Sequence, residues 1–298
     1  MLHVVKYYKI LFIFSGILIA GSLAALIFWG LNFGIDFRGG SLMEIQFNAP
    51  QDTQALTTAL SAAGYGTALV QPSQDNKVFI KIPSANSEED HVAIQNLIKM
   101  DFGDFDELRF DSVGPVVGEE LRQKAYWQTG LVILGILLYI AYAFRKVGVK
   151  RVDRKVTPWR MSLAAVVALI HDLIITLGAF AVLGRIWHVE IDALFVTALL
   201  TILGFSVHDT IVVFDRVREN MQVEHGLPFS EILNYSVNQT LTRSINTSIT
   251  VLFVLLALAL FGGSTIFYFV VALILGITVG TYSSIYVASS LLLVWSRE

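Results

Sequence analysis

Two His-Asp pairs stand inside long apolar runs of this sequence. His171-Asp172 lies near the middle of one run, and His208-Asp209 lies in the next. An ionisable side chain within a membrane is costly, so such residues usually mark a functional site. Desolvation raises the pKa of a buried carboxylic acid and a nearby guanidinium lowers it, so a moving cation could switch the group between its protonation states. The chemistry indicated is proton transfer across a membrane.

Arg243 is the candidate cation for this switch. It comes just before the fifth apolar run, where Arg243, Asn246 or Thr247, and Thr250 fall on one helical stripe between apolar flanks. A polar stripe of this kind should face protein or trapped water rather than lipid. Each proton that crossed would deliver about 2.3 kcal/mol per 100 mV of membrane potential. The candidate proton pathway is Asp209, Arg243, His208 and Asp172.

Each of these residues also has a plainer structural interpretation. The two aspartates could serve only as hydrogen-bond partners between helices, and the two histidines could be packing residues or simple donors. Arg243 could extend its side chain to the cytoplasmic surface. The charged residues that follow His208-Asp209 are expected to form a solvated helix end. They are Asp215, Arg216, Arg218 and Glu219.

The candidate residues lie in a chain of apolar runs with one polar segment. Hydrophobic residues make up 55% of the 298 and charged residues only 15%, against about 25% charged residues in an ordinary soluble chain. A transmembrane helix needs about 20 predominantly apolar residues. Six runs meet or approach that length, so the sequence predicts a polytopic α-helical membrane protein. The predicted spans are residues 10–29, 127–144, 161–183, 191–214, 245–261 and 265–295.

The basic residues indicate how these spans are oriented. The connection between the second and third spans, residues 145–160, has seven basic residues and one acidic residue. Such a loop is expected on the cytoplasmic side, which places both termini in the cytoplasm and residues 31–125 in the periplasm. The first run is expected to stay as an uncleaved anchor, because it is too long for a secretory signal and no clear cleavage site follows it.

The polar segment is predicted to be a small α+β domain between the first and second spans. Residues 32–125 hold 14 acidic and 7 basic residues, and Ser87 with Asp90 forms an N-cap pattern. The order βαββαβ predicts a ferredoxin-like sandwich. The expected strands are 40–48, 67–71, 77–82 and 105–112, and the expected helices are 52–63 and 87–100. The predicted domains are 1–30 (cytoplasmic segment and first span), 31–125 (periplasmic domain) and 126–298 (five transmembrane helices).

Other classes of function find little support in the sequence. The chain has no cysteine, which excludes disulfides and thiolate chemistry. His3, His91 and His188 are isolated from one another, so no metal site is expected. No basic run indicates nucleic-acid binding. We therefore expect a protein that is not an enzyme and that uses no cofactor.

Small residues in the last run allow close contact between helices. Gly276 and Gly280 form a GxxxG pattern, and Ser283, Ser284 and Ser289 follow it. Packing within the chain is the interpretation that we prefer for this series.

Several motifs resemble those of the SecD/SecF family of protein-export membrane proteins. Residues 34–40, Gly-Ile-Asp-Phe-Arg-Gly-Gly, match its signature after the first span, and residues 113–121 resemble its second hallmark. Residues 204–220 look like its fourth-span motif, and residues 238–244 and 280–285 match its fifth- and sixth-span segments. Together they favour the six-span members with one external domain over SecD or a fused form. The residues matched in the first two motifs are Gly34, Asp36, Gly39, Gly40, Gly114, Pro115 and Gly118.

The resemblance implies half of a transporter of the resistance-nodulation-division type, located in the bacterial inner membrane. It implies an auxiliary subunit that completes protein export with the proton motive force. The implied partners are SecD, the SecYEG channel, the translocating preprotein and membrane lipids, with YajC as a further candidate. Carried onto this chain, the family's proton-pathway residues fall on Asp209 and Arg243. His208 departs from the motif, which usually has Asn there, so it could join the relay or only replace an amide hydrogen bond.

Two other functions stay open from the sequence. The first is a half-size, proton-coupled exporter of small molecules or lipids, although such exporters normally carry larger external domains. The second is a passive scaffold whose soluble domain only binds partners. If the chain is a passive scaffold, substitution of Asp209 or Arg243 would leave it functional. If the chain couples export to protons, the same substitutions would abolish proton-dependent export.

Overall fold

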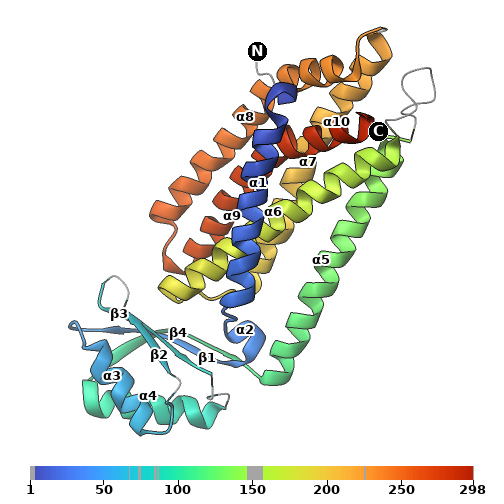
Figure 1. The fold of residues 1–298 in the computed structure, drawn as a ribbon. Coiled ribbons are helices and arrows are strands. Elements are labelled where there is room, and N and C mark those ends of the chain that lie inside the picture. Colours follow the sequence, from blue (N-terminus) through green and yellow to red (C-terminus); the bar gives the residue numbers. More distant parts are fainter. Residues whose placement is uncertain are drawn as a thin grey trace. The chain divides into compact units, whose positions relative to one another are not determined.

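The computed structural model describes residues 4–66, 68–72, 75–83, 85, 87–145, 157–224 and 226–297. The chain divides into two compact units (Figure 1). The helical unit holds the described residues of Met1–Asn32, Gln128–Val189 and Leu194–Glu298, and the α+β unit holds those of Phe33–Trp127 and Glu190–Ala193. Most of the predicted cytoplasmic loop, residues 146–156, lies outside the described residues.

Among the described residues, six helical stretches are long and apolar enough to cross a membrane, which confirms the number of predicted spans. The last is continuous from α9 through a π-helical segment, Ser283–Ala288, into α10. The bounds are α1 Val4–Phe28, α5 Pro115–Ala143, α6 Pro158–Trp187, α7 Ala193–Val223, α8 Phe229–Phe261, α9 Ser264–Tyr282 and α10 Ser289–Arg297.

Helices α5 and α8 begin well before the predicted spans at residues 127 and 245. The added turns of α5 are polar and carry ion pairs one turn apart, such as Lys124 Nζ to Glu120 Oε1 at 2.7 Å. A helix satisfies its backbone hydrogen bonds internally, so it continues past the point where its apolar stretch stops. Hydropathy alone therefore underestimated both helices.

The helical unit is built around α6 and α7. In the apolar 18-residue stretch of each helix, 56% of the residues are buried for α6 and 50% for α7, against 11% for α1 and 6% for α5. Glycines allow the closest approaches: a Cβ on Gly178 would lie 2.3 Å from the Ser22 Cβ, and one on Gly276 would lie 2.2 Å from Ile202 Cδ1. Gly178 thus packs α6 against α1, and Gly276 packs α9 against α7. The second contact confirms the predicted role of the GxxxG pattern within the chain.

The α+β unit is the predicted ferredoxin-like sandwich. Its four-stranded sheet has the order β2-β3-β1-β4 with every neighbouring pair antiparallel. The strands are β1 Gly40–Phe47, β2 Leu69–Pro72, β3 Lys77–Ile82 and β4 Phe105–Val113, and the helices are α2 Ile35–Arg38, α3 Thr53–Ala62 and α4 Glu88–Phe102.

Alternation along β1 places Met43, Ile45 and Phe47 in the core of this unit, beside Leu56 of α3 and Ile94 of α4. Both long helices begin at capping residues, and the cap of α4 is the predicted one. The Asp52 side chain accepts a hydrogen bond from Gln54 N at 2.8 Å, and Ser87 with Asp90 forms a capping box.

Candidate functional site

Asp209 lies on α7 in the interior of the helical unit, where only 7% of its surface is exposed. The Ser244 hydroxyl on α8 donates to Asp209 Oδ1, and the Ser284 hydroxyl in the π-helical segment donates to Oδ2. Both carboxylate oxygens are therefore held by hydroxyl groups from two other helical segments.

Asp172 lies on α6 and is fully buried. Its Oδ2 accepts hydrogen bonds from Ser206 Oγ at 2.6 Å and from Ser283 Oγ at 2.7 Å. The Nδ1 of His171 lies 2.9 Å from Asp172 Oδ1. This second carboxylate is thus also surrounded by polar donors in the interior.

Two short stretches connect the surroundings of the two carboxylates. Ser283 and Ser284 are consecutive in the π-helical segment, and one contacts Asp172 while the other contacts Asp209. On α7, Ser206 contacts Asp172 one turn before Asp209 itself. π-Helical turns are rare and occur frequently at functional sites. The two aspartates therefore belong to one polar cluster, formed by α6, α7, α8 and the π-helical segment.

His171 stands at the edge of this cluster. Its ring stacks on the Tyr282 ring, with centroids 6.3 Å apart. The Nε2 atom is buried and has no hydrogen-bond partner among the described residues. A buried polar atom without a partner is unfavourable, and this nitrogen therefore has an unused capacity to bind water.

The cluster has the chemistry that a proton relay requires. A serine hydroxyl can donate one hydrogen bond and accept others, and a carboxyl group can do the same when it is protonated. Hydroxyl donors favour an ionised carboxylate, whereas burial away from water favours the neutral acid. Because these two effects oppose each other, a small movement of a hydroxyl donor can change the protonation state of a carboxyl group.

The other two members of the predicted pathway lie apart from this cluster. His208 and Arg243 are exposed on the surface of this chain, and no ion pair joins Arg243 to Asp209 among the residues that the structure describes. Asn246, Thr247 and Thr250 are exposed as well. Within this chain α8 turns Ser244 and Ser248 inward and leaves the stripe exposed, so the expectation that the stripe faces protein or trapped water stays a prediction.

The charged end of α7 is solvated, as expected. Arg218 Nη2 lies 2.5 Å from Asp215 Oδ1, and Arg216 Nη1 lies 2.9 Å from Glu219 Oε2. At least a third of each of these side chains is exposed. They form surface ion pairs rather than part of the buried cluster.

Four serines that hold the aspartates are not among the predicted site residues: Ser206, Ser244, Ser283 and Ser284. In the sequence, Ser283 and Ser284 stand out only as small residues that permit close packing. One usable signal was spacing, since Ser206 lies three residues before Asp209 and so shares its side of the helix. For the other three, the sequence does not distinguish a donor from a residue that is merely small.

The residues of the first two family motifs meet in the α+β unit. Gly39 has φ +82°, and a Cβ on it would lie 2.9 Å from the Pro115 Cα. A Cβ on Gly118 would lie 3.0 Å from Gly39 N. Any larger residue would therefore separate the two motifs, and at Gly39 it would also adopt a strained backbone. Of the other glycines in the two motifs, Gly40 packs against Pro83, whereas Gly114 has open space around it.

Gly34 and Asp36 hold the short segment Glu190–Ala193, which belongs to the same unit. Gly34 N donates to Ile191 O at 2.9 Å, and Ala193 N donates to Asp36 Oδ2 at 2.8 Å. Lys81 on β3 forms an ion pair with Glu190 at 2.9 Å. The first motif thus has a structural function that its sequence did not indicate.

Comparison with known proteins gives two family matches. A model described as "Protein export membrane protein SecD/SecF, C-terminal" matches residues 93–298, and one described as "SecD/SecF GG Motif" matches residues 25–51. The protein translocase subunit SecF of Thermobaculum terrenum is 45% identical, and the alignment covers 100% of this chain and 95% of that protein. The SecF of Vibrio alginolyticus is 42% identical over 97% of this chain and 88% of that protein.

A solved structure also matches nearly the whole chain. It is the crystal structure of SecDF, a translocon-associated membrane protein from Thermus thermophilus, with a TM-score of 0.84 and 32% identity. The match covers 98% of this chain but 38% of the SecDF chain. Because one family model matches more than half of the chain and the SecF relatives align along almost their full length, this chain belongs to the SecD/SecF family, among its SecF members.

Proposed function

We propose that this chain is an auxiliary subunit of the bacterial Sec preprotein translocase that acts with SecD to complete export across the inner membrane. Its SecF relatives are named as protein translocase subunits, and the solved SecDF is described as translocon-associated. The proposed role is non-catalytic, and its energy source is the proton motive force. The observation that carries the proposal is Asp209, buried within a membrane-spanning helix and held by Ser244 and Ser284.

In the proposed mechanism Asp209 gains a proton from the periplasmic side and releases it to the cytoplasm. Asp172 extends the pathway, because Ser283 and Ser206 hold it next to the same π-helical segment and the same turn of α7. Arg243 approaches Asp209 in one state only and favours its ionised form there. Each proton that passes then supplies about 2.3 kcal/mol per 100 mV for movement of the soluble domain.

The exposed polar stripe on α8 supports SecD as a partner. An arginine on the lipid-facing side of a span is costly, yet Arg243 and Asn246 are exposed on this chain. Transporters built from two repeats place their pathway between the repeats. This chain corresponds to 38% of the fused SecDF chain, so SecD is expected to supply the second repeat and to cover the stripe.

The proposed topology puts both termini in the cytoplasm and the α+β unit in the periplasm. There the unit would bind the emerging preprotein, while SecYEG and YajC would contact the complex within the membrane. The basic connection between the second and third spans supports this orientation.

An export assay on single variants of the α7 carboxylates tests the proposal. Asp209→Asn keeps the shape of the side chain but removes the titratable group. We expect it to abolish the part of preprotein release into the periplasm that a protonophore also abolishes. Cells would produce the variant together with SecD in the absence of their own SecF, and membrane levels of the protein would be matched.

Asp215→Asn is the matched control, because it is the same change on the same helix but at an exposed ion pair. It should export as the unaltered protein does. Normal proton-dependent release by Asp209→Asn would refute the proposed site, and a loss of release in both variants would show that the effect is not specific to the buried cluster.

A further inference from the structure

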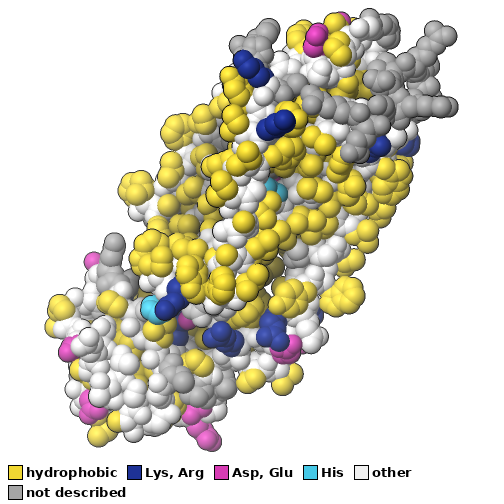
Figure 2. All heavy atoms as spheres, viewed as in Figure 1, with side chains coloured by type: hydrophobic (Ala, Val, Ile, Leu, Met, Phe, Trp, Pro, Cys, Tyr) yellow, Lys and Arg dark blue, Asp and Glu magenta, His cyan; other side chains and the backbone are white. Residues whose placement is uncertain are grey.

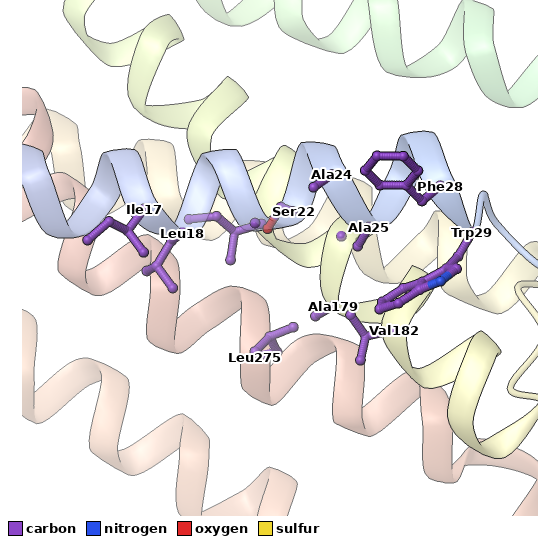
Figure 3. A pocket seen from close by; sticks show the side chains of 13 residues that line it. Ile17, Leu18, Ser22, Ala24, Ala25, Phe28, Trp29, Ala179, Val182 and Leu275 are labelled. Carbon is purple, nitrogen blue, oxygen red and sulfur yellow. The ribbon is translucent and has the colours of Figure 1, made fainter.

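An apolar groove runs along α1 in the helical unit (Figure 3). α6 forms its floor with residues such as Ala179 and Val182, and Leu275 of α9 stands opposite α1. The groove has a volume of about 520 Å³. Among the described residues that line it, no side chain is charged, and Ser22 and the Trp29 indole carry the only polar side-chain groups.

The two ends of the groove differ. One end reaches Trp29, directly after the last residue of α1, and tryptophan side chains gather at the membrane–water interface. The lining on α1 stops at Ile17, and beyond it Tyr282 bridges from α9 to α1. The Tyr282 hydroxyl donates to Leu11 O at 3.1 Å, and its ring meets the Phe14 ring edge to face at 5.6 Å. The groove therefore extends from Trp29 on the side of the interface to Tyr282 on the side of the membrane interior.

The length of the groove matches a single leaflet. A helix rises about 1.5 Å per residue, so the distance from Ile17 to Trp29 is about 18 Å. Half of a hydrocarbon core of about 30 Å is about 15 Å. The groove thus extends from the interface to the middle of the bilayer and ends there.

We propose that this groove binds one acyl chain of a bilayer phospholipid, from the leaflet at the Trp29 end of α1. A transmembrane helix is about 10 Å wide and crosses both leaflets, so a groove that ends halfway, at Tyr282, would hold only part of it. An acyl chain has the required length and needs no polar partner. Lipid tails are as apolar as the lining, so the affinity comes from van der Waals contact with α1, α6 and α9 at once.

Photolabelling with a phosphatidylglycerol probe tests this assignment. The full chain would be placed in nanodiscs containing the lipid with a diazirine either at the end of one acyl chain or next to its ester. We expect the terminal diazirine to label peptides around Ile17 and Leu275, and the ester-proximal one to label peptides around Phe28 and Trp29. Peptide mass spectrometry measures both patterns without any substitution.

A pair of glycine variants provides the second measurement. An added Cβ meets no atom within 4 Å at Gly21 or at Gly16, and both glycines are exposed on α1, but only Gly21 lines the groove. Gly21→Phe should fill the groove and lose most of the labelling. Gly16→Phe should retain it.

Three results would overturn the proposal. One is labelling of Phe253 and Leu260, which are exposed on α8, at the same yield as the residues of the groove. In that case the labelling pattern would also be the same for the two positions of the diazirine. Another is an equal effect of the two glycine variants, whether labelling is kept or lost. The third is capture of a helix of SecD at Ile17 and Leu275, with loss of lipid labelling, when SecD is present.

Discussion

The helical unit buries carboxylates and hydroxyl groups beside its apolar core, whereas the core of the α+β unit is almost entirely apolar. In the α+β unit Ile45 and Ile80 are fully buried and the charged residues lie outside, as in a water-soluble domain. In the helical unit Asp172 and Ser283 are fully buried, while Ile13 is 64% exposed. Hydrophobic side chains cover the face of the helices that Figure 2 shows. Lipid solvates apolar groups, so the interior of the helical unit is where polar groups find partners.

This difference predicts unequal effects of removing the same apolar atoms from the two units. Ile45→Ala deletes buried methyl and methylene groups from the core of the α+β unit. It should lower the free energy of unfolding of that unit by about 2–5 kcal/mol, because transfer energy is lost and a cavity forms. Hydrogen exchange at the β1 and β3 amides of the full chain in nanodiscs measures the change. Protection that stays as in the unaltered protein would show that this unit is not held by its own core.

Close packing between helices should be the main source of stability in the helical unit. Gly178→Val places a Cβ within 2.3 Å of the Ser22 Cβ and must move α1 away from α6. Overpacking of this kind costs about 1–3 kcal/mol, and thermal unfolding of the full chain in detergent should report it. Gly135→Val is the control, since an added Cβ there meets no atom within 4 Å. Equal melting temperatures for the two variants would contradict the packing.

The α+β unit should also respond to acid through Glu107. Burial raises the pKa of this carboxyl group, but hydrogen bonds from His91 at 2.8 Å and Gln95 at 2.7 Å outweigh burial, so the pKa lies below its usual value of 4.5. A lowered pKa in the folded state means that the contribution to stability is complete above about pH 4.5 and is lost as the pH falls through the folded pKa. Because the group is partly exposed, we expect under about 1 kcal/mol.

Hydrogen exchange at the β4 amides between pH 6 and pH 3, corrected for the intrinsic exchange rate, measures this loss. Glu107→Gln should remove the acid dependence that it contributes. Glu88→Gln is the control, because it alters another carboxylate near His91. Glu88 is 83% exposed, so this variant should keep the acid dependence of the unaltered protein. An unchanged acid profile in Glu107→Gln would assign the effect to a different group.

The fold could be predicted from the sequence because its signals are local. Each apolar run and each alternating strand is visible within about 20 residues, and Ser87 with Asp90 marked a helix start directly. The segment Glu190–Ala193 could not be assigned to the α+β unit, because its contact with Asp36 joins residues 157 positions apart. A contact of that range leaves no periodic trace in a single sequence.

The site was predictable only in its charged members. Asp209 and Asp172 stood out because carboxylates are rare in apolar runs, and both are buried as membrane carboxylates should be. Their serine donors did not stand out, since serine serves equally as a small packing residue. Arg243 is exposed on this chain, and the partner proposed to cover it, SecD, is not encoded by this sequence.

The smallest effect is expected for Ile13→Ala on α1, the same substitution as in Ile45→Ala. Ile13 is 64% exposed, so in the membrane its side chain contacts lipid in both the unaltered and the truncated protein. Lipid refills the space that the side chain leaves, and no cavity forms inside the protein, so the change should stay within about 0.5 kcal/mol. Thermal unfolding of the full chain in nanodiscs measures it beside Ile45→Ala. A loss as large as that of Ile45→Ala would mean that Ile13 contacts protein rather than lipid, and the contrast between the two units would then not extend to α1.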